Sequence, residues 1–352
     1  MKKIRLAFVG SGFNGQIGFI QNFHKNKNCE IAGLAEARPK LLEKVSKKFG
    51  IKNKYSSHKG IIHNINKFDG VVIVTKRNML PAIAYDFLKL GKPVLTEKPM
   101  ASSLLQAKKL IQVSNQNRTL YKVGYNKTYD EGVQKAKSIF KKILKKKILG
   151  KIVFIRSHRL SGSGYDSENI YIKTNEKNLL NKPEWKAKPN WLPKKFERTY
   201  AKFLNLYCHN INLFKYFTNI KPKIIFSDLS DTRMSTVILD YGNFRASLET
   251  GFFTKNGWDE TFEIFFEHGH IKIILPPQHK KNKGSTVLVY ENSKNKFTKR
   301  YTFKSWSFKR QSDAFINDIK TKSVKQNNAK AAVEDIEIIE SIWKRFIKKN
   351  VN

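Results

Sequence analysis

The sequence predicts an α/β protein with two parts, a doubly wound parallel sheet in the first 124 residues and a largely antiparallel sheet after it. Short apolar runs alternate with amphipathic helical runs through the first part, which is the pattern of successive βαβ units. From Gly150 onward, strand-like runs follow one another through tight turns such as Tyr241-Gly242-Asn243 and His268-Gly269. A chain of 352 residues is long enough to bury two separate cores.

In the first part, most of the expected strands are apolar runs, and the one at 54–56 is short and polar. The strands are expected at 4–9, 29–36, 54–56, 71–75, 93–96 and 120–123. The helices between them are expected at 16–25, 39–49, 58–64, 79–90 and 102–117. Pro39 near the first turn of one helix and Gly50 at its end are typical helix boundaries.

In the second part, two helices precede most of the strands and two more follow them. Helices are expected at 129–147, 200–217, 309–321 and 329–348, and the last could pack back on the first part. Strands are expected at 151–159, 223–228, 234–240, 244–250, 260–267, 270–275, 286–290 and 296–303.

The first strand ends in the turn Gly10-Ser11-Gly12-Phe13-Asn14-Gly15. In the G-x-G-x-x-G spacing, the first glycine makes the turn, the second lets the backbone approach a pyrophosphate, and the third lets the helix lie close on the strand. The spacing alone could equally be a glycine-rich turn without a ligand. Because it lies between a strand and a helix, we predict a dinucleotide site at Gly10, Gly12, Phe13, Asn14 and Gly15.

Glu36 ends the second apolar run, about 20 residues after the glycine loop, where a carboxylate can accept from the ribose 2'-OH. A carboxylate repels a 2'-phosphate, so Glu36 favours NAD over NADP. Arg38, two residues on, leaves NADP possible. The interpretation that we prefer for Arg38 is an exposed arginine at a helix start.

The formal net charge is +40, from 68 basic and 28 acidic residues. Such an excess can indicate a nucleic-acid or membrane partner. However, the lysines are spread along the chain beside abundant Asn, Ile and Phe, which are the residues that AT-rich codons specify. The densest run, Lys141–Lys147, has amphipathic spacing typical of a solvated helix face. We therefore expect neither partner, although the field could gather anionic substrates.

Cysteine and histidine usage suggests neither disulfides nor a metal centre. Cys29 and Cys208 are too few for a disulfide framework or a C-x-x-C site, and the eight histidines include no H-E-x-x-H arrangement. No run of 18 apolar residues exists, and no cleavage pattern follows the N-terminal apolar stretch. These features predict a cytoplasmic protein.

The tripeptide Glu97-Lys98-Pro99 follows the expected strand 93–96. Ligands of a doubly wound sheet gather beyond the carboxyl ends of its strands, so Lys98 is expected where a nicotinamide would lie. Pro99 fixes the backbone after it. The alternative is a surface Lys-Pro turn without a function. It would not explain why Glu97 and a buried strand directly precede the lysine.

With this motif the sequence resembles the glucose-fructose oxidoreductase, inositol dehydrogenase and MocA (Gfo/Idh/MocA) family over nearly its whole length. The matching stretches are VGSGFNG, VVIVTKRNMLPAIAYDFLKLGKPVLTEKPMA, KVGYNKTYDEGV, LGKIVFIRSH, NLYCHNINLFKYF, ETGF and WDETFEIFFEHG. The resemblance implies a Rossmann domain at 1–124 and, at 125–352, an α+β substrate and oligomerisation domain with a large open sheet. It also implies a nicotinamide cofactor, a sugar, polyol or nucleotide-sugar substrate, and a homo-oligomer.

The resemblance further implies residue roles at the matching positions. Oxidising a carbinol transfers a hydride to nicotinamide while the hydroxyl loses its proton, so a base and an orienting cation are needed. His209 falls on the histidine of the family's D-x-x-x-H segment and is expected to be the acid/base, with Lys98 as the cation. Thr75, Glu97, Lys98 and Asn126 are expected at the cofactor.

The sequence also departs from the family's pattern. Asn205 replaces the aspartate one helical turn before His209, and an amide cannot stabilise an imidazolium by charge. Tyr207 replaces a glycine and is expected to reshape the substrate pocket, as is the larger Thr199-Tyr200-Ala201; Lys76-Arg77-Asn78 replaces a proline-containing turn. Two alternatives to a simple dehydrogenase therefore stay open. One keeps its cofactor bound through a redox cycle, and the other is a cofactor-binding regulatory or structural protein with attenuated or lost catalysis.

Overall fold

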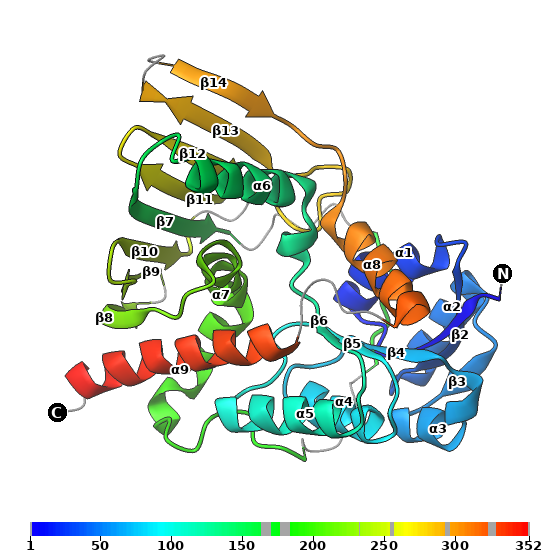
Figure 1. Cartoon of the computed structure of the whole chain (residues 1–352). Coiled ribbons are helices and arrows are strands. Elements are labelled where there is room, and N and C mark those ends of the chain that lie inside the picture. The colour runs from blue at the N-terminus through cyan, green and yellow to red at the C-terminus, as the bar shows by residue number, and fades with distance from the viewer. Residues whose placement is uncertain are drawn as a thin grey trace. The chain divides into compact units, whose positions relative to one another are not determined.

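A computed structural model describes residues 2–162, 170–176, 184–231, 233–253, 257–292, 296–322 and 329–350. The chain forms two compact units, and each is described by itself (Figure 1). The first unit comprises Met1–Tyr125, Asn169–Glu197 and Phe308–Ile336. The second comprises Asn126–Glu168, Arg198–Ser307 and Glu337–Asn352. The first unit therefore takes segments from three separate parts of the sequence.

The first unit is built on a six-stranded sheet with the order β3-β2-β1-β4-β5-β6. The strands are β1 (Ile4–Val9), β2 (Cys29–Ala35), β3 (Asn53–Tyr55), β4 (Gly70–Ile73), β5 (Val94–Thr96) and β6 (Tyr121–Val123). Neighbouring strands pair in parallel throughout this sheet. The order reverses between β1 and β4, which confirms the expected doubly wound sheet and places the ligand crevice at the carboxyl ends of these strands.

Most helices of the first unit connect its strands. They are η1 (Gly15–Ile20), α1 (Gln21–His24), α2 (Pro39–Phe49), α3 (His58–His63), η2 (Ile65–Lys67), α4 (Leu80–Lys89) and α5 (Leu104–Gln116). Others, η4 (Lys194–Phe196) and, from Phe308 on, α8 (Ser307–Thr321), come from later segments of the chain. All four residues of β4 are buried, as expected for a strand covered on both faces. The helix expected over 16–25 instead begins as the π-helical turn η1, where Gly15 and Gly18 lower the cost of leaving α-helical geometry.

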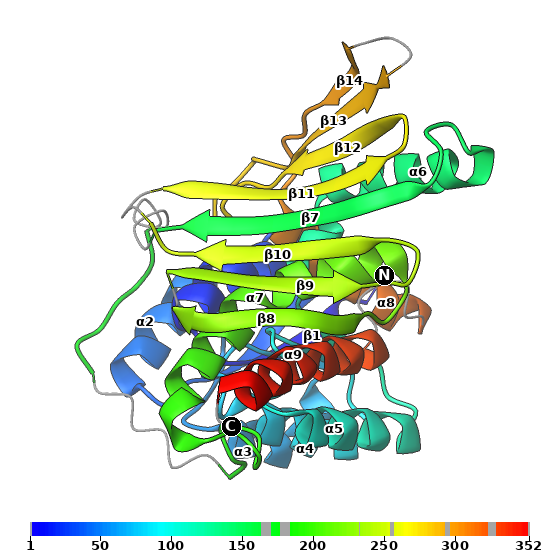
Figure 2. The same cartoon turned by 90° about the vertical axis from the view of Figure 1, so that its left-hand side faces the viewer.

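The second unit is built on an eight-stranded sheet with the order β14-β13-β12-β11-β7-β10-β9-β8, whose strands lie side by side in Figure 2. They are β7 (Ile152–Ser161), β8 (Lys223–Asp231), β9 (Met234–Asp240), β10 (Arg245–Gly251), β11 (Trp258–Phe266), β12 (Gly269–Ile274), β13 (Thr286–Glu291) and β14 (Lys296–Tyr301). The β7–β10 pair is parallel and the others are antiparallel, which confirms the mostly antiparallel sheet.

Helices of the second unit pack on this sheet through aromatic residues. They are η3 (Asn126–Tyr129), α6 (Glu131–Lys146), α7 (Glu197–Thr218) and the part of α9 (Ala329–Asn350) from Glu337 on. From α7, Phe214 and Phe217 place their rings 5.2 and 5.0 Å from that of Phe262 on β11. Along β7, Arg156 lies exposed on one face and Arg159 is buried on the other, so the two faces of the sheet differ in chemistry.

No helix within the described residues is both long enough and apolar enough to pass through a bilayer.

Candidate cofactor and catalytic sites

Three glycines shape the loop between β1 and η1, and they do so for different reasons. Gly10 has φ +92°, and a Cβ there would lie 2.3 Å from the carbonyl oxygen of Val74. A Cβ on Gly15 would lie 2.9 Å from the carbonyl oxygen of Gly10, so helix and strand approach as the motif requires. A Cβ on Gly12 would have Nη2 of Arg38 as its nearest neighbour, 3.8 Å away. Packing thus demands Gly10 and Gly15, whereas the space at Gly12 suits a pyrophosphate.

Glu36 lies directly after β2 and is buried. Its carboxylate accepts hydrogen bonds from the backbone N–H (3.0 Å) and hydroxyl (3.1 Å) of Ser11. Arg38 donates to the same carboxylate from Nε (2.8 Å), Nη2 (3.0 Å) and its backbone N–H (3.2 Å). Burial alone would raise the pKa of Glu36, but these donors hold it below its usual range. Glu36 is therefore an ionised acceptor that ties β2 to the glycine loop.

The expectation that Arg38 is an exposed arginine is wrong. Its side chain is 21% exposed, and the guanidinium forms a two-pronged ion pair with Glu36. The pair with Glu36 raises the pKa of Arg38. A cation and an anion thus lie together where the adenosine ribose of a dinucleotide is expected.

Glu97 connects the end of β5 to the glycine loop. One carboxylate oxygen accepts from Nδ2 of Asn14 at 3.3 Å, and the other accepts from the backbone N–H of Lys98. The following Lys98–Pro99 peptide bond is cis. The structure therefore brings together Asn14, Glu97 and the backbone of Lys98, three of the residues that the sequence singled out.

Thr75 and Asn126, both expected at the cofactor, belong to different units. The Cα of Thr75 would be 3.4 Å from a Cβ at Gly10, so Thr75 lies against the glycine loop. Asn126 belongs to the second unit, is buried, and donates from Nδ2 to the hydroxyl of Ser307 at 3.1 Å.

Sequence reasoning missed a segment of the first unit, residues 170–176, which contacts the glycine loop. The side chain of Gln16 donates to the carbonyl of Ile172 (3.0 Å) and accepts from its N–H (2.9 Å). The rings of Phe13 and Tyr171 lie 5.0 Å apart. Glu176 accepts from the backbone at the start of α2. Contacts across more than 130 residues leave no local pattern, so no signal in the sequence indicated them.

Helix α7 carries the predicted catalytic residues of the second unit. His209 is 1% exposed, whereas Asn205, one helical turn earlier, is exposed to solvent. Tyr207, two residues from His209, points to nearly the opposite face because two residues turn a helix by about 200°. Lys98 belongs to the first unit and His209 to the second.

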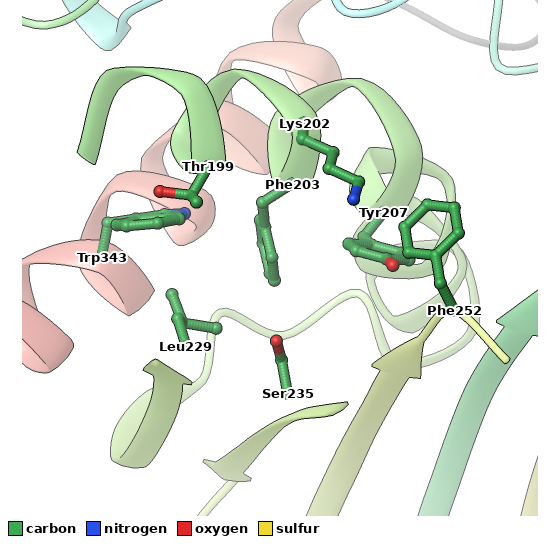
Figure 3. A pocket seen from close by; sticks show the side chains of 8 residues that line it. All are labelled: Thr199, Lys202, Phe203, Tyr207, Leu229, Ser235, Phe252 and Trp343. Atoms are coloured by element: carbon green, nitrogen blue, oxygen red, sulfur yellow. The ribbon is translucent and has the colours of Figure 1, made fainter. Parts of the chain in front are cut away.

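Tyr207 lines a small cavity of the second unit, shown in Figure 3. The other lining residues come from α7, α9 and the strands β8 and β9 or follow β10: Thr199, Lys202, Phe203, Leu229, Ser235, Phe252 and Trp343. The cavity offers about 10 Å³, which is room for one water molecule. It cannot hold a sugar, so Tyr207 contributes here to the packing of α7.

A buried polar cluster lies beside His209 in the same unit. Lys127 forms an ion pair with Glu260, and Asn210 donates to Glu260 (3.2 Å) and to the hydroxyl of Ser157 (3.1 Å). Burial lowers the pKa of Lys127 to about 8, although Glu260 opposes the change. The cluster fixes α7 against β7 and β11. Within the described residues, no group of three or more His, Cys, Asp or Glu side chains is arranged to hold a metal ion.

Comparisons with known proteins agree with this geometry. Residues 4–125 match the family model GFO_IDH_MocA, described as an oxidoreductase family with an NAD-binding Rossmann fold. A search of curated protein sequences found no significant match.

Solved structures match the fold over nearly the whole chain. One is KijD10, a 3-ketoreductase from Actinomadura kijaniata in complex with NADP and TDP-benzene, with a TM-score of 0.75, 12% identity, and coverage of 97% of this chain and 98% of that one. Another is an oxidoreductase from Agrobacterium radiobacter in complex with NAD+, L-tartaric acid and magnesium, with a TM-score of 0.73, 15% identity, and coverage of 100% and 98%. Residues 4–125 thus match the Gfo/Idh/MocA family model, and the fold of the whole chain is similar to that of these solved oxidoreductases.

Proposed function

We propose that this NAD(P)-dependent oxidoreductase transfers a hydride between nicotinamide and a hydroxyl-bearing carbon of a sugar, polyol or nucleotide sugar. The observation that carries the proposal is the pair of contacts made by Glu97, which accepts from Asn14 of the glycine loop and from the backbone of Lys98. One buried carboxylate thereby fixes the lysine relative to the loop that would hold the cofactor's phosphates.

In this reaction Lys98 serves as the orienting cation and His209 as the acid/base. A nicotinamide dinucleotide held at the glycine loop would supply the hydride acceptor for the carbinol carbon. Lys98 donates a hydrogen bond from its ammonium to the hydroxyl oxygen and stabilises the negative charge that develops there. His209 takes the hydroxyl proton as the C=O bond forms, and returns it in the reduction.

Two observations support the substrate class. KijD10 and the Agrobacterium radiobacter oxidoreductase were crystallised with TDP-benzene and L-tartaric acid, both of which are anionic. The net charge of +40 favours accumulation of anions near this protein. A nucleotide sugar or a sugar that carries a carboxylate or phosphate is therefore the first class to assay.

We also infer a homo-oligomer formed through the open face of the eight-stranded sheet. Arg156 and Glu249 pair at 2.6 Å on this face, and Ile274 is 41% exposed on β12. Sedimentation analysis of the purified protein tests this inference, and a monomer at all concentrations would refute it.

The function is tested by cofactor binding and turnover measured side by side. We expect saturable quenching or a shift of NADH fluorescence, and turnover with at least one member of a panel of sugars, polyols and nucleotide sugars. Lys98→Ala should lower turnover by about 10²–10⁴-fold and leave NADH binding intact. Lys89→Ala, at the exposed last turn of α4, is the matched control and should change neither quantity. Turnover that survives Lys98→Ala would remove this lysine from the mechanism.

A second candidate is a cofactor-binding protein with attenuated or lost catalysis. Asn205, in place of an aspartate one turn before His209, favours it. A cofactor retained through a redox cycle is the remaining enzymatic alternative, and the contacts of residues 170–176 with the glycine loop favour it. Nicotinamide absorbance in the protein as purified, without net release of NADH during turnover, identifies that case.

A further inference from the structure

The start of helix α2 is occupied by a carboxylate from a distant part of the sequence. The two carboxylate oxygens of Glu176 accept from the backbone N–H groups of Lys40 (2.8 Å) and Leu41 (3.0 Å). α2 runs over 11 residues from Pro39. The N–H groups of Lys40 and Leu41 lie in its first turn, where backbone donors have no acceptor within the helix. The contact joins residues 136 positions apart within the first unit. An anion is thus already seated at this helix start.

The same place is where a dinucleotide fold distinguishes NAD from NADP. The adenosine ribose lies at the end of the second strand, where Glu36 can accept from its 2'-OH. A 2'-phosphate needs a cation and N–H donors there. The chain offers the guanidinium of Arg38 as the cation and the backbone N–H groups in the first turn of α2 as the donors. Glu36 already binds Arg38 in two places, and Glu176 already takes the N–H groups.

Glu36 alone explains a preference for NAD poorly, because its charge is paired with Arg38. Four of the charged groups at this end of the sheet, Glu36, Arg38, Glu176 and Lys40, have formal charges that sum to zero. The field of Glu176 also acts on Arg38 and on Lys40. Without Glu176 the sum becomes +1, and two backbone donors become available to a phosphate.

We propose that Glu176 is a specificity-determining residue, an internal carboxylate that occupies the anion subsite a 2'-phosphate would use and so makes the protein select NAD over NADP. The inference rests on the proposed function, because it requires a nicotinamide dinucleotide at the glycine loop. The contacts of Gln16 with Ile172 and of Phe13 with Tyr171 hold the segment that delivers Glu176.

The test compares the dissociation constants of NADH and NADPH, measured by fluorescence at low salt, in three proteins. In Glu176→Gln the ratio Kd(NADPH)/Kd(NADH) should fall about five- to tenfold, mainly through tighter NADPH binding, as expected for a charge and helix-terminus effect. Glu43→Gln removes the same charge from an exposed position of the same helix and should leave the ratio unchanged. The difference between the variants should shrink as added salt screens the charges.

The outcomes separate this inference from the function beneath it. Suppose that the wild-type protein binds NADH but that Glu176→Gln leaves the ratio Kd(NADPH)/Kd(NADH) unchanged, or that Glu43→Gln changes it equally. Either result overturns the role of Glu176 and leaves the proposed function standing. Equal weakening of both nucleotides in Glu176→Gln also overturns it, since Glu176 would then only hold its segment in place. A wild-type protein that binds neither nucleotide overturns the proposed function and this inference together. Thermal melting of each variant confirms that it is folded.

Discussion

At the scale of single residues, the polar partners of α7 decide how strong a base His209 can be. An amide at Asn205 can orient the imidazole, but it lacks the charge that would stabilise the imidazolium. Glu260, the buried carboxylate of the cluster, is already engaged by Lys127 and Asn210. We therefore expect the residue at position 205 to influence the strength of the base.

We predict that Asn205→Asp raises the rate. A carboxylate one turn before His209 should raise the pKa of the imidazole, and a rise of about one unit would give less than a tenfold gain in the rate of proton abstraction, because the Brønsted slope is below one. The acidic limb of the pH–rate profile should move to higher pH by the same amount. Steady-state kinetics across pH measure both quantities. Turnover absent in both proteins with every substrate would favour the non-enzymatic candidate.

At the scale of helices and strands, a buried ion pair fastens α8 to the parallel sheet. Lys122 on β6 pairs with Asp318 on α8, and both side chains are 2% exposed or less. Burial lowers the pKa of Lys122, and Asp318 opposes this. In this way a helix from the C-terminal part of the sequence completes the first unit.

We predict that Asp318→Asn lowers the free energy of unfolding by about 3–5 kcal/mol, because it leaves a buried ammonium without a counter-charge. The double variant Lys122→Met, Asp318→Leu should recover most of this loss, since it removes both charges. Urea denaturation of the three proteins gives the comparison. Equal stability of Asp318→Asn and the wild type would show that water or another group compensates Lys122.

The elements that sequence could predict are those with a local pattern. The four buried residues of β4 follow from a continuous apolar run, and the hairpins β9–β10 and β11–β12 follow from turns at Gly242 and Gly269. The motif at Glu97 could be placed for the same reason, because it directly follows a buried strand. The prediction for Arg38 failed because an exposed helix start and an ion pair with Glu36 look identical in sequence. The role of Glu176 depends on a contact across 136 residues, which no local pattern encodes.

At the scale of the whole molecule, the excess of positive charge opposes folding. The 68 basic residues outnumber the 28 acidic ones, so 40 cations have no formal counter-charge in the chain. On α6, burial, with a smaller contribution from the positive charge of Lys141, lowers the pKa of Lys137 to about 8. Exposed ion pairs such as Lys54 with Glu43 each contribute at most about 1 kcal/mol. Repulsion should therefore outweigh attraction between surface charges.

We predict that moderate salt stabilises this protein. Raising the ionic strength from about 0.01 to 0.15 M shortens the Debye length from about 30 to 8 Å, which screens repulsion between cations spread over the surface. The urea midpoint should rise over this range in NaCl. A variant with Gln at Lys141, Lys142 and Lys145, all exposed on α6, should have a higher midpoint at low salt and a smaller rise, because Gln keeps a helix propensity close to that of Lys. A midpoint that falls with salt would mean instead that ion pairs dominate, and the excess of lysine would then carry no cost for the fold.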